Sequence, residues 1–139
     1  MAFYGCPYPI VKHPRGLLRT QSGMDQIKSD LLSLLLTEPG ERVMLPDFGT
    51  NLKRFIFEQN DSSVLGEIRN EISRAISTWE PRIAVQNIEV TNGSDILGSI
   101  NEQDAKEDLQ HIILIKILFT NFENIQKVEE LRLEIPIGG

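Results

Sequence analysis

Residues 37–58 read TEPGERVMLPDFGTNLKRFIFE and lie between two stretches with helical periodicity. The segment holds two prolines and two glycines, which restrict or redirect the backbone. Its large apolar side chains are Val43, Met44, Leu45, Phe48, Leu52, Phe55, Ile56 and Phe57. A solvated linker has few such residues, and a long connection inside a compact domain is usually functional or tightly packed. We therefore expect an ordered loop that buries these side chains and also faces a partner.

The residues before this loop predict an amphipathic helix that begins near Ser22. Its apolar stripe has helical spacing and consists of Met24, Ile27, Leu31, Leu34 and Leu35. Ser22 and Asp25 have the spacing of a capping box, in which two side chains satisfy free amides of the first turn. Pro39 and Gly40 are expected to stop the helix.

The residues after the loop predict a second helix, with its N-cap within residues 61–63. Its apolar face consists of Leu65, Ile68, Ile72, Ala75, Ile76 and Trp79. Pro81 ends this helix and pushes Glu80 out of helical geometry. Glu80 and Arg82 therefore flank a proline at a helix-to-strand corner. Two interpretations stay open: solvated charges at a chain break, or a preset charge pair that ties the corner or meets an adjacent subunit.

Three segments after this corner predict strands. Residues 83–92 are rich in β-branched side chains, with an irregularity near Gln86 and Asn87. Residues 109–121 are apolar on both faces, which is typical of a central strand covered on both sides. The last segment alternates, with Leu131, Leu133, Ile135 and Ile137 facing in and Glu130, Arg132, Glu134 and Pro136 facing out. Pro136 indicates that this strand lies at a sheet edge.

These elements predict an α+β domain, with two main helices on one face of a small, mainly antiparallel three-stranded sheet. We expect a long exposed acidic loop over residues 93–108 and a polar connection over residues 121–127. An open edge of the sheet can accept a strand from another chain. Residues 1–21 contain three prolines and predict an extended arm that packs on its own domain or on another subunit. The domain organisation is thus an arm over 1–21 and a single domain over 22–139.

The composition excludes several classes of protein. The formal net charge of −6 argues against nucleic-acid binding, which needs clustered cations. No apolar run is long enough to span a membrane, no secretory signal is expected, and one cysteine fits a reducing compartment. The charge is uneven, because residues 1–23 carry Lys12, Arg15 and Arg19 and no acid. Docking on an acidic neighbour and a solvated tail are both open interpretations of this arm.

The sequence contains no established catalytic or metal-binding motif. It lacks a nucleophile elbow, a P-loop and a dinucleotide-binding glycine pattern, and His13 and His111 with one cysteine are too few zinc ligands. We therefore expect neither a metal nor a cofactor. The acids with apolar neighbours are Glu38, Glu41, Asp47, Glu58 and Glu80. Two of them can in principle form a glycosidase pair, so a muramidase-like peptidoglycan hydrolase is the alternative function.

Residues 37–58, the long helix after them and the tripeptide Glu80, Pro81, Arg82 together resemble the baseplate-wedge family of contractile phage tails. The same family includes the sheath-initiating baseplate subunit of type VI secretion systems, and some of its members were once labelled lysozymes. The resemblance covers about residues 15–137. Besides the tripeptide, the matching positions are Gly40, Glu41, Arg42, Pro46, Phe48, Gly49, Leu52, Phe57 and Glu58.

The resemblance implies a structural role and no enzymatic activity. It implies a baseplate subunit in six-fold arrangement around the tube, which binds neighbouring wedge proteins and accepts a strand from the tail sheath to initiate sheath assembly. It implies a place in the virion after assembly in the host cytoplasm, or alternatively in the baseplate of a secretion or injection system. The residues expected to bind partners are Glu41, Arg42, Phe48, Glu80, Pro81, Arg82, Arg132 and Glu134. We expect Glu41 and Arg42 to lie at the same end of the domain as Glu80 and Arg82.

Overall fold

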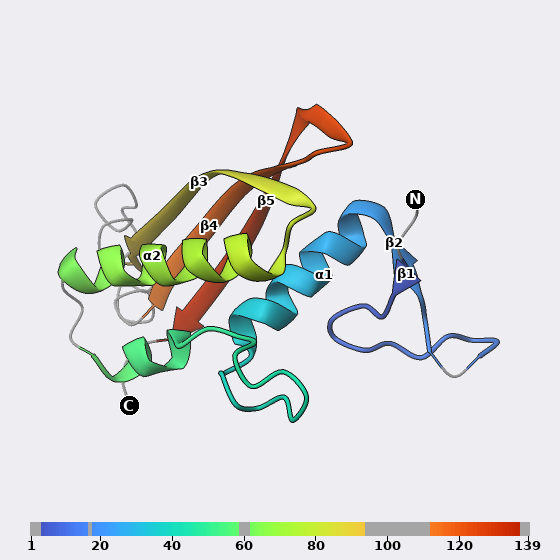
Figure 1. Ribbon diagram of the computed structural model, residues 1–139, viewed down its shortest axis with the longest axis horizontal. Coiled ribbons are helices and arrows are strands. Elements are labelled where there is room, and N and C mark those ends of the chain that lie inside the picture. Colours follow the sequence, from blue (N-terminus) through green and yellow to red (C-terminus); the bar gives the residue numbers. More distant parts are fainter. Residues whose placement is uncertain (1–3, 17, 59–61, 94–111, 137–139) are drawn as a thin grey trace, which may run out of the picture.

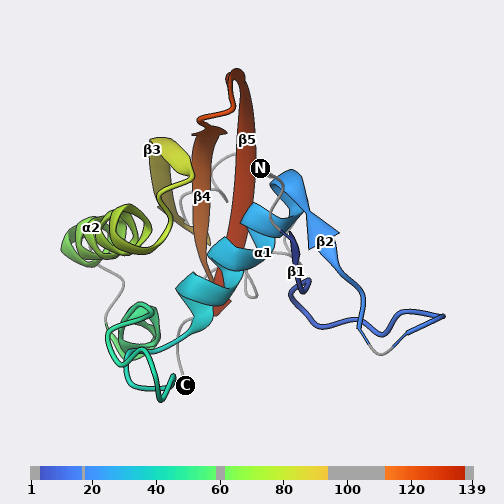
Figure 2. The same ribbon diagram turned by 45° about the vertical axis from the view of Figure 1, so that its right-hand side comes forward.

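The structure is a computed structural model that describes residues 4–16, 18–58, 62–93 and 112–136. The elements in chain order are β1 (Tyr4–Gly5), β2 (Gln21–Ser22), α1 (Gly23–Leu36), the 3-10 helix η1 (Leu52–Phe57), α2 (Ser62–Trp79), β3 (Ile83–Asn92), β4 (Ile112–Asn121) and β5 (Asn124–Pro136). The two long helices cover one face of the three-stranded sheet (Figures 1 and 2). The predicted α+β architecture is confirmed. Among the described helices, none is long and apolar enough to cross a membrane.

The sheet is antiparallel and has the order β3-β4-β5, so β4 is the central strand and β5 an edge, as predicted. The register of β3 on β4 shifts between Val85 and Asn87, which confirms the predicted irregularity. The expected polar connection over 121–127 is wrong, because β5 already begins at Asn124. The Asn121 side chain accepts a hydrogen bond from the Glu123 amide at 3.1 Å, and this local bond lets the chain reverse in two residues.

The core lies between the sheet and the helices. Both predicted helical stripes contribute to it, and the central strand adds Ile113, Ile115, Ile117 and Phe119. The expectation that both faces of this strand are covered is wrong for the described residues. Ile112, Leu114 and Leu118 remain only half-buried on the face away from the helices. The described helices pack on one face only, so this second face of β4 stays partly open.

Helix α1 begins as predicted, but without the expected capping box. Ser22 occupies the N-cap and its side chain makes no capping hydrogen bond. Ser22 instead pairs with Tyr4 in the small β1-β2 ladder, which places its backbone in an extended conformation. The helix ends at Leu36, before Pro39 and Gly40, and the Thr37 amide donates to the Ser33 carbonyl at 3.1 Å.

The loop after α1 buries only part of its apolar content, so the prediction for it was partly wrong. Leu52 and Phe55 are buried and Phe48 packs against the core. Val43 and Met44, in contrast, are 93% and 89% exposed. Leu45 and Phe57 are also exposed, and the side chain of Ile56 lies outside the described residues.

Backbone hydrogen bonds explain why the loop tip points to solvent. The Gly40 amide donates to the Pro46 carbonyl at 2.8 Å, which closes a small ring and turns residues 41–45 outward. The base of the loop is tied back to α1, because the Thr50 amide donates to the Thr37 carbonyl at 2.8 Å. Gly49 has φ +123, and a Cβ there would lie 2.3 Å from the Thr37 carbonyl oxygen, so only glycine fits this close approach.

The N-terminal arm contacts its own domain near its base. Strand β1 pairs with β2, and a Cβ on Gly5 would lie 2.4 Å from the Gln26 amide nitrogen. The Arg19 amide donates to the Val11 carbonyl at 2.9 Å, so the segment between them forms a loop. This loop projects away from α1 in both views (Figures 1 and 2). The expected acidic loop over 93–108, apart from Gly93, lies outside the described residues, as does Ile137.

Candidate functional site

Arg82 connects the corner between α2 and β3 to helix α1. Its Nε and Nη2 donate to the two carboxylate oxygens of Glu80, both at 2.6 Å. Its Nη2 also donates to Asp30 Oδ2 at 2.5 Å. The hydrogen bonds that Arg82 donates to Glu80 and then to Asp30 outweigh partial burial and hold the pKa of Arg82 above its usual value. The guanidinium is therefore charged at any ordinary pH, and the predicted charge pair ties the corner together.

The geometry of this corner follows from the proline. The Glu80 amide still donates to the Ile76 carbonyl at 2.9 Å, which completes the last turn of α2. Pro81 then breaks the helix and stays exposed, while the Glu80 side chain is only 6% exposed. The Phe122 amide donates to the Arg82 carbonyl at 3.3 Å, so the corner is also tied to the β4-β5 turn. Several elements thus hold one exposed proline in place.

The loop after α1 adds a cation and two aromatic rings beside this corner. The Arg42 guanidinium carbon lies 4.1 Å from the centroid of the Phe48 ring. Phe48 in turn meets Trp79 edge to face, with ring centroids 5.3 Å apart. Arg42 also donates to the Ser33 hydroxyl at 3.3 Å. These contacts fix the direction of an otherwise exposed arginine.

A pocket of about 220 Å³ lies where the corner and the loop meet. Four predicted site residues line it together: Arg42, Phe48, Glu80 and Arg82. Glu41 does not line it, because its carboxylate accepts a hydrogen bond from the Glu38 amide at 2.9 Å and approaches Lys53 at 3.4 Å. That amide and Lys53 lower the pKa of Glu41.

Pro81 does not line the pocket either and is exposed at the corner. The last two predicted site residues, Arg132 and Glu134, are exposed on the edge strand β5. They stand opposite Lys116 and Leu114 of β4, and Arg132 pairs with Glu130. Four predicted residues therefore share a corner pocket, Glu41 and Pro81 lie outside it, and two lie on a separate strand edge.

Asp30, Ser33 and Trp79 also line the pocket, and the sequence did not indicate a role for Asp30 or Ser33 there. Asp30 accepts from both Arg82 and Gln26 Nε2, the latter at 2.7 Å. Gln26 and Asp30 are four residues apart, so they are neighbours on one helix face. This spacing is the only feature of the sequence that could have indicated a contact of Asp30. That spacing says nothing about Arg82, which is far away in the chain.

The described residues contain no cluster of metal-ligating side chains. The carboxyl groups with a resolved shift are Glu41, Glu71, Glu129 and Glu130, and the pKa of each is lowered by hydrogen bonds or cations. A glycosidase general acid requires the opposite shift. None of these four carboxyl groups therefore has the raised pKa that this chemistry needs.

The fold agrees with the comparisons to known proteins. The family model of the baseplate wedge protein gp25 matches residues 21–120. The chain belongs to this family of structural baseplate components, as its resemblance implied.

A particular relative is the baseplate wedge protein gp25 of Enterobacteria phage T4, which is 26% identical over 113 residues. The alignment covers 81% of this chain and 75% of that protein. A crystal structure of a protein from Geobacter sulfurreducens, named as a tail lysozyme, matches with TM-score 0.68 and 26% identity, over 86% of this chain and 95% of that one. A chain of the anti-feeding prophage baseplate shares the fold, with TM-score 0.62 and 19% identity, over 99% of this chain and 87% of that one.

Proposed function

We propose that this protein is a baseplate wedge subunit that binds neighbouring wedge proteins through its corner pocket and starts sheath assembly at its open sheet edge. It acts in a six-fold arrangement around the tail tube, in the virion, after assembly in the host cytoplasm. The observation that carries this proposal is the Arg82 network, which fixes the corner that carries Pro81 and lines one pocket together with Arg42 of the loop.

The corner formed by Glu80, Pro81 and Arg82 is rigid, which favours its use as a binding surface. A surface that is ordered before binding loses little conformational entropy on association. Arg82 is 26% exposed and already holds its two carboxylates, so its charge serves mainly to fix the corner. Pro81 and the loop tip, in contrast, are exposed. They therefore supply the surface that a partner contacts.

The open edge of β5 suits the addition of a sheath strand. Each added ladder hydrogen bond contributes about 0.5–1.5 kcal/mol net, so a single lent strand binds modestly. Several such sites on one ring bind an incoming sheath ring far more strongly through multivalency. Arg132 and Glu134 lie on this edge strand, where their charges select the strand that fits.

A peptidoglycan hydrolase remains the second candidate because a relative carries the name tail lysozyme. The lowered pKa of Glu41 argues against this residue as the general acid of such an enzyme. Purified protein in a cell-wall clearing assay is expected to release no material. Clearing that a single Glu→Gln change abolishes would establish the hydrolase instead.

Substitution of Arg82 tests the docking role in the assembling system. We expect Arg82→Ala to leave the domain folded and to stop assembly of sheathed tails, scored by electron microscopy. Because this change leaves Glu80 buried without its partner, the double change Glu80→Gln with Arg82→Met removes both charges and protects the fold. It is expected to block assembly as well. Arg69→Ala, an exposed cation on α2, is the matched control and should assemble normally. Normal sheathed tails in both Arg82 variants would overturn the role of the corner.

A further inference from the structure

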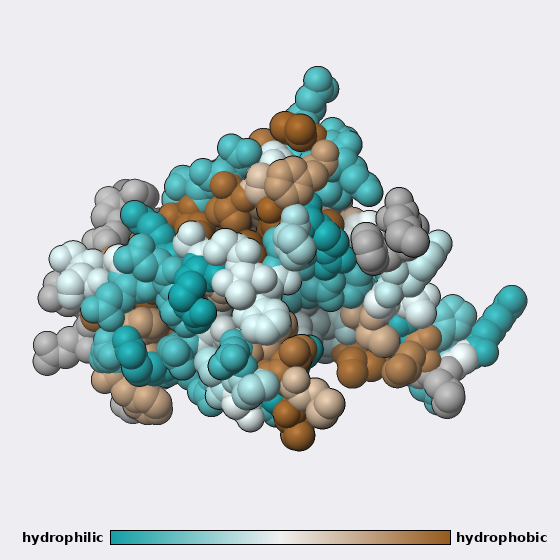
Figure 3. Space-filling view, in the orientation of Figure 1, coloured by the Kyte–Doolittle hydropathy of each residue, from teal (hydrophilic) through white to brown (hydrophobic). Residues whose placement is uncertain are grey.

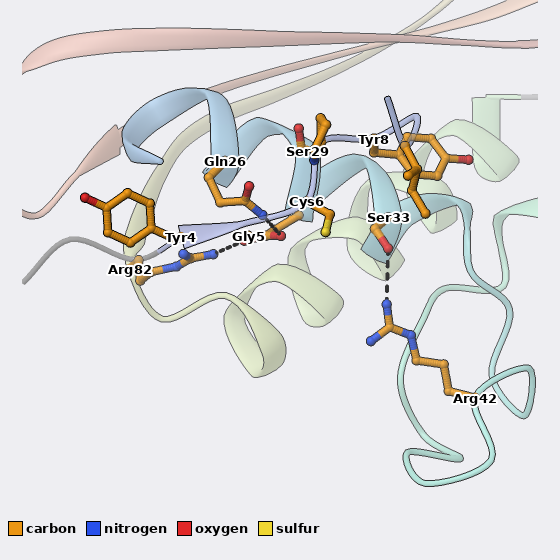
Figure 4. A pocket seen from close by; sticks show the side chains of 12 residues that line it. Tyr4, Gly5, Cys6, Tyr8, Gln26, Ser29, Ser33, Arg42 and Arg82 are labelled. Carbon is orange, nitrogen blue, oxygen red and sulfur yellow. Dashed lines mark hydrogen bonds and ion pairs between the residues drawn. The ribbon is translucent and has the colours of Figure 1, made fainter. Parts of the chain in front are cut away.

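A cleft of about 470 Å³ lies between the N-terminal arm and helix α1. Arm residues 4–10 form one wall, the polar face of α1 forms the floor, and Arg42 and Arg82 stand at the other side. Figure 4 shows Tyr8 and Cys6 on the arm side of the cleft and Arg42 reaching Ser33 from the loop. Arm and loop are distant in the sequence, and together they bound one hollow.

The arm and the loop that bound this cleft carry cations without an ion-pair partner in the described part of the chain. Among the described residues, the Lys and Arg side chains without an ion pair are Lys12, Arg15, Arg19, Arg42 and Arg69. All but Arg69 belong to the arm or to the loop at the cleft. Residues 1–23 contain no acid to compensate them, although the whole chain has a net charge of −6. Elsewhere on the described surface, every Lys and Arg except Arg69 has an ion pair with a carboxylate of the same chain.

The one carboxylate in the floor of the cleft is already engaged. Asp30 accepts from Gln26 through one oxygen and from Arg82 through the other. Asp30 and Glu80 both hold Arg82, and neither of them is paired with Arg42. Arg42 contacts only the Ser33 hydroxyl and the face of Phe48 among the described residues.

The arm and the loop that bound this cleft also expose apolar side chains, of which Tyr8 and Ile10 line the cleft itself. Tyr8, Ile10 and Val11 are exposed on the arm, and Val43 and Met44 on the loop tip. Figure 3 shows hydrophobic surface on one side of the molecule, over the loop after α1 and over the arm. Apolar patches of this kind on a folded domain mark a binding surface.

We infer that this cleft binds an acidic segment of another protein, whose carboxylates face Arg42 and the arm cations and whose apolar side chains pack on the arm and the loop tip. The inference rests on the proposed docking role of this face and names the chemistry of the segment that docks. Charge complementarity selects the segment and the apolar contacts hold it.

A selection experiment on the purified full-length protein tests this inference. Random peptides displayed from a library are selected on the protein, and the enriched peptides are synthesised and titrated. We expect enriched sequences to combine Asp or Glu with bulky apolar residues. Their affinity should fall by about tenfold or more for Arg42→Glu and for Lys12→Glu with Arg15→Glu, because each change replaces an attraction with a repulsion. Arg69→Glu changes the net charge as much as Arg42→Glu does and should leave the affinity unchanged.

Four results would overturn the inference: no enriched peptide, enriched peptides without acids, acidic peptides whose affinity ignores the Arg42 and arm changes, or equal loss with Arg69→Glu. The other partner for a basic surface is a polyanion. Binding of duplex DNA, or of vesicles of phosphatidylcholine and phosphatidylserine, that the same arm changes abolish would assign the surface to that class instead. If the peptide experiment gives one of these results while the Arg82 variants still block tail assembly, the docking role of the corner stands. Only the proposal of an acidic partner segment is then excluded.

Discussion

Arg82 and Asp30 stand 52 positions apart in the chain and meet at 2.5 Å between Nη2 and Oδ2. This contact joins the first helix to the corner that follows the second, and Glu80 holds the same guanidinium from the other side. The exposed proline between Glu80 and Arg82 is therefore fixed by residues on two sides. A baseplate subunit gains from such a corner because its partners meet a surface that is already in place.

Removal of the Asp30 charge is expected to weaken the fold slightly. Because Asp30 is partly exposed, we expect Asp30→Asn to lower the free energy of unfolding by about 1 kcal/mol or less. Urea denaturation of the purified domain measures the change. Asp47→Asn, at an exposed carboxylate of the loop, is the control and should have no effect. Equal stability of all three proteins would show that the contact contributes nothing to the corner.

Substitution of Gly49 tests the geometry of the loop after α1, and the same substitution at Gly66 in α2 is its control. Gly49→Ala is expected to destabilise the domain by about 1–3 kcal/mol from its backbone conformation alone, and further through the clash with the Thr37 carbonyl. Gly66 lies in α2 with no atom close to an added Cβ, so Gly66→Ala should stabilise by about 0.5–1 kcal/mol. Thermal unfolding of the two variants gives opposite shifts in Tm if the loop is held as described. A tolerated Gly49→Ala would contradict the tight base of the loop.

Glu129 predicts a dependence of stability on pH. Hydrogen bonds from Lys127 and then Lys28 lower its pKa to about 2, and the Lys28 contact at 2.8 Å links α1 to β5. Because the pKa of Glu129 is lower in the folded state, its ionisation stabilises the fold at pH values above about 4.3, the pKa of a glutamate in the unfolded chain. This stabilisation is lost as the pH falls from about 4.3 toward 2. Denaturation at several pH values should show this loss between these limits. Glu129→Gln is expected to flatten that part of the curve, and an unchanged slope would contradict the assignment.

Regular elements were predictable from the sequence because their periodicity is local. The stripe of α2, the irregularity of β3 at Asn87 and the alternation of β5 each reflect burial on one face. The tripeptide corner was predictable for a similar reason, since Pro81 must end a helix. Its two charges, Glu80 and Arg82, are separated by one residue, so their pairing needed no knowledge of the fold.

Long-range contacts and the loop tip were not predictable in this way. Nothing in the sequence connects Asp30 to Arg82, because their contact depends on how α1 and α2 pack. Val43 and Met44 were predicted to be buried since apolar residues in an ordered loop usually are. The hydrogen bond between Gly40 and Pro46 turns them outward instead. Their exposure, which apolarity alone cannot indicate, now favours a binding surface.

The central claim is that the corner and its loop meet another baseplate protein, and site-specific cross-linking in assembled tails tests it most directly. A photoreactive residue is placed at Pro81 and at Met44, with Arg69 as the control on the exposed face of α2. We expect cross-links from Pro81 and Met44 to another baseplate protein, identified by mass spectrometry, and none from Arg69. Assembled tails in which Pro81 and Met44 give no cross-link would contradict the claim.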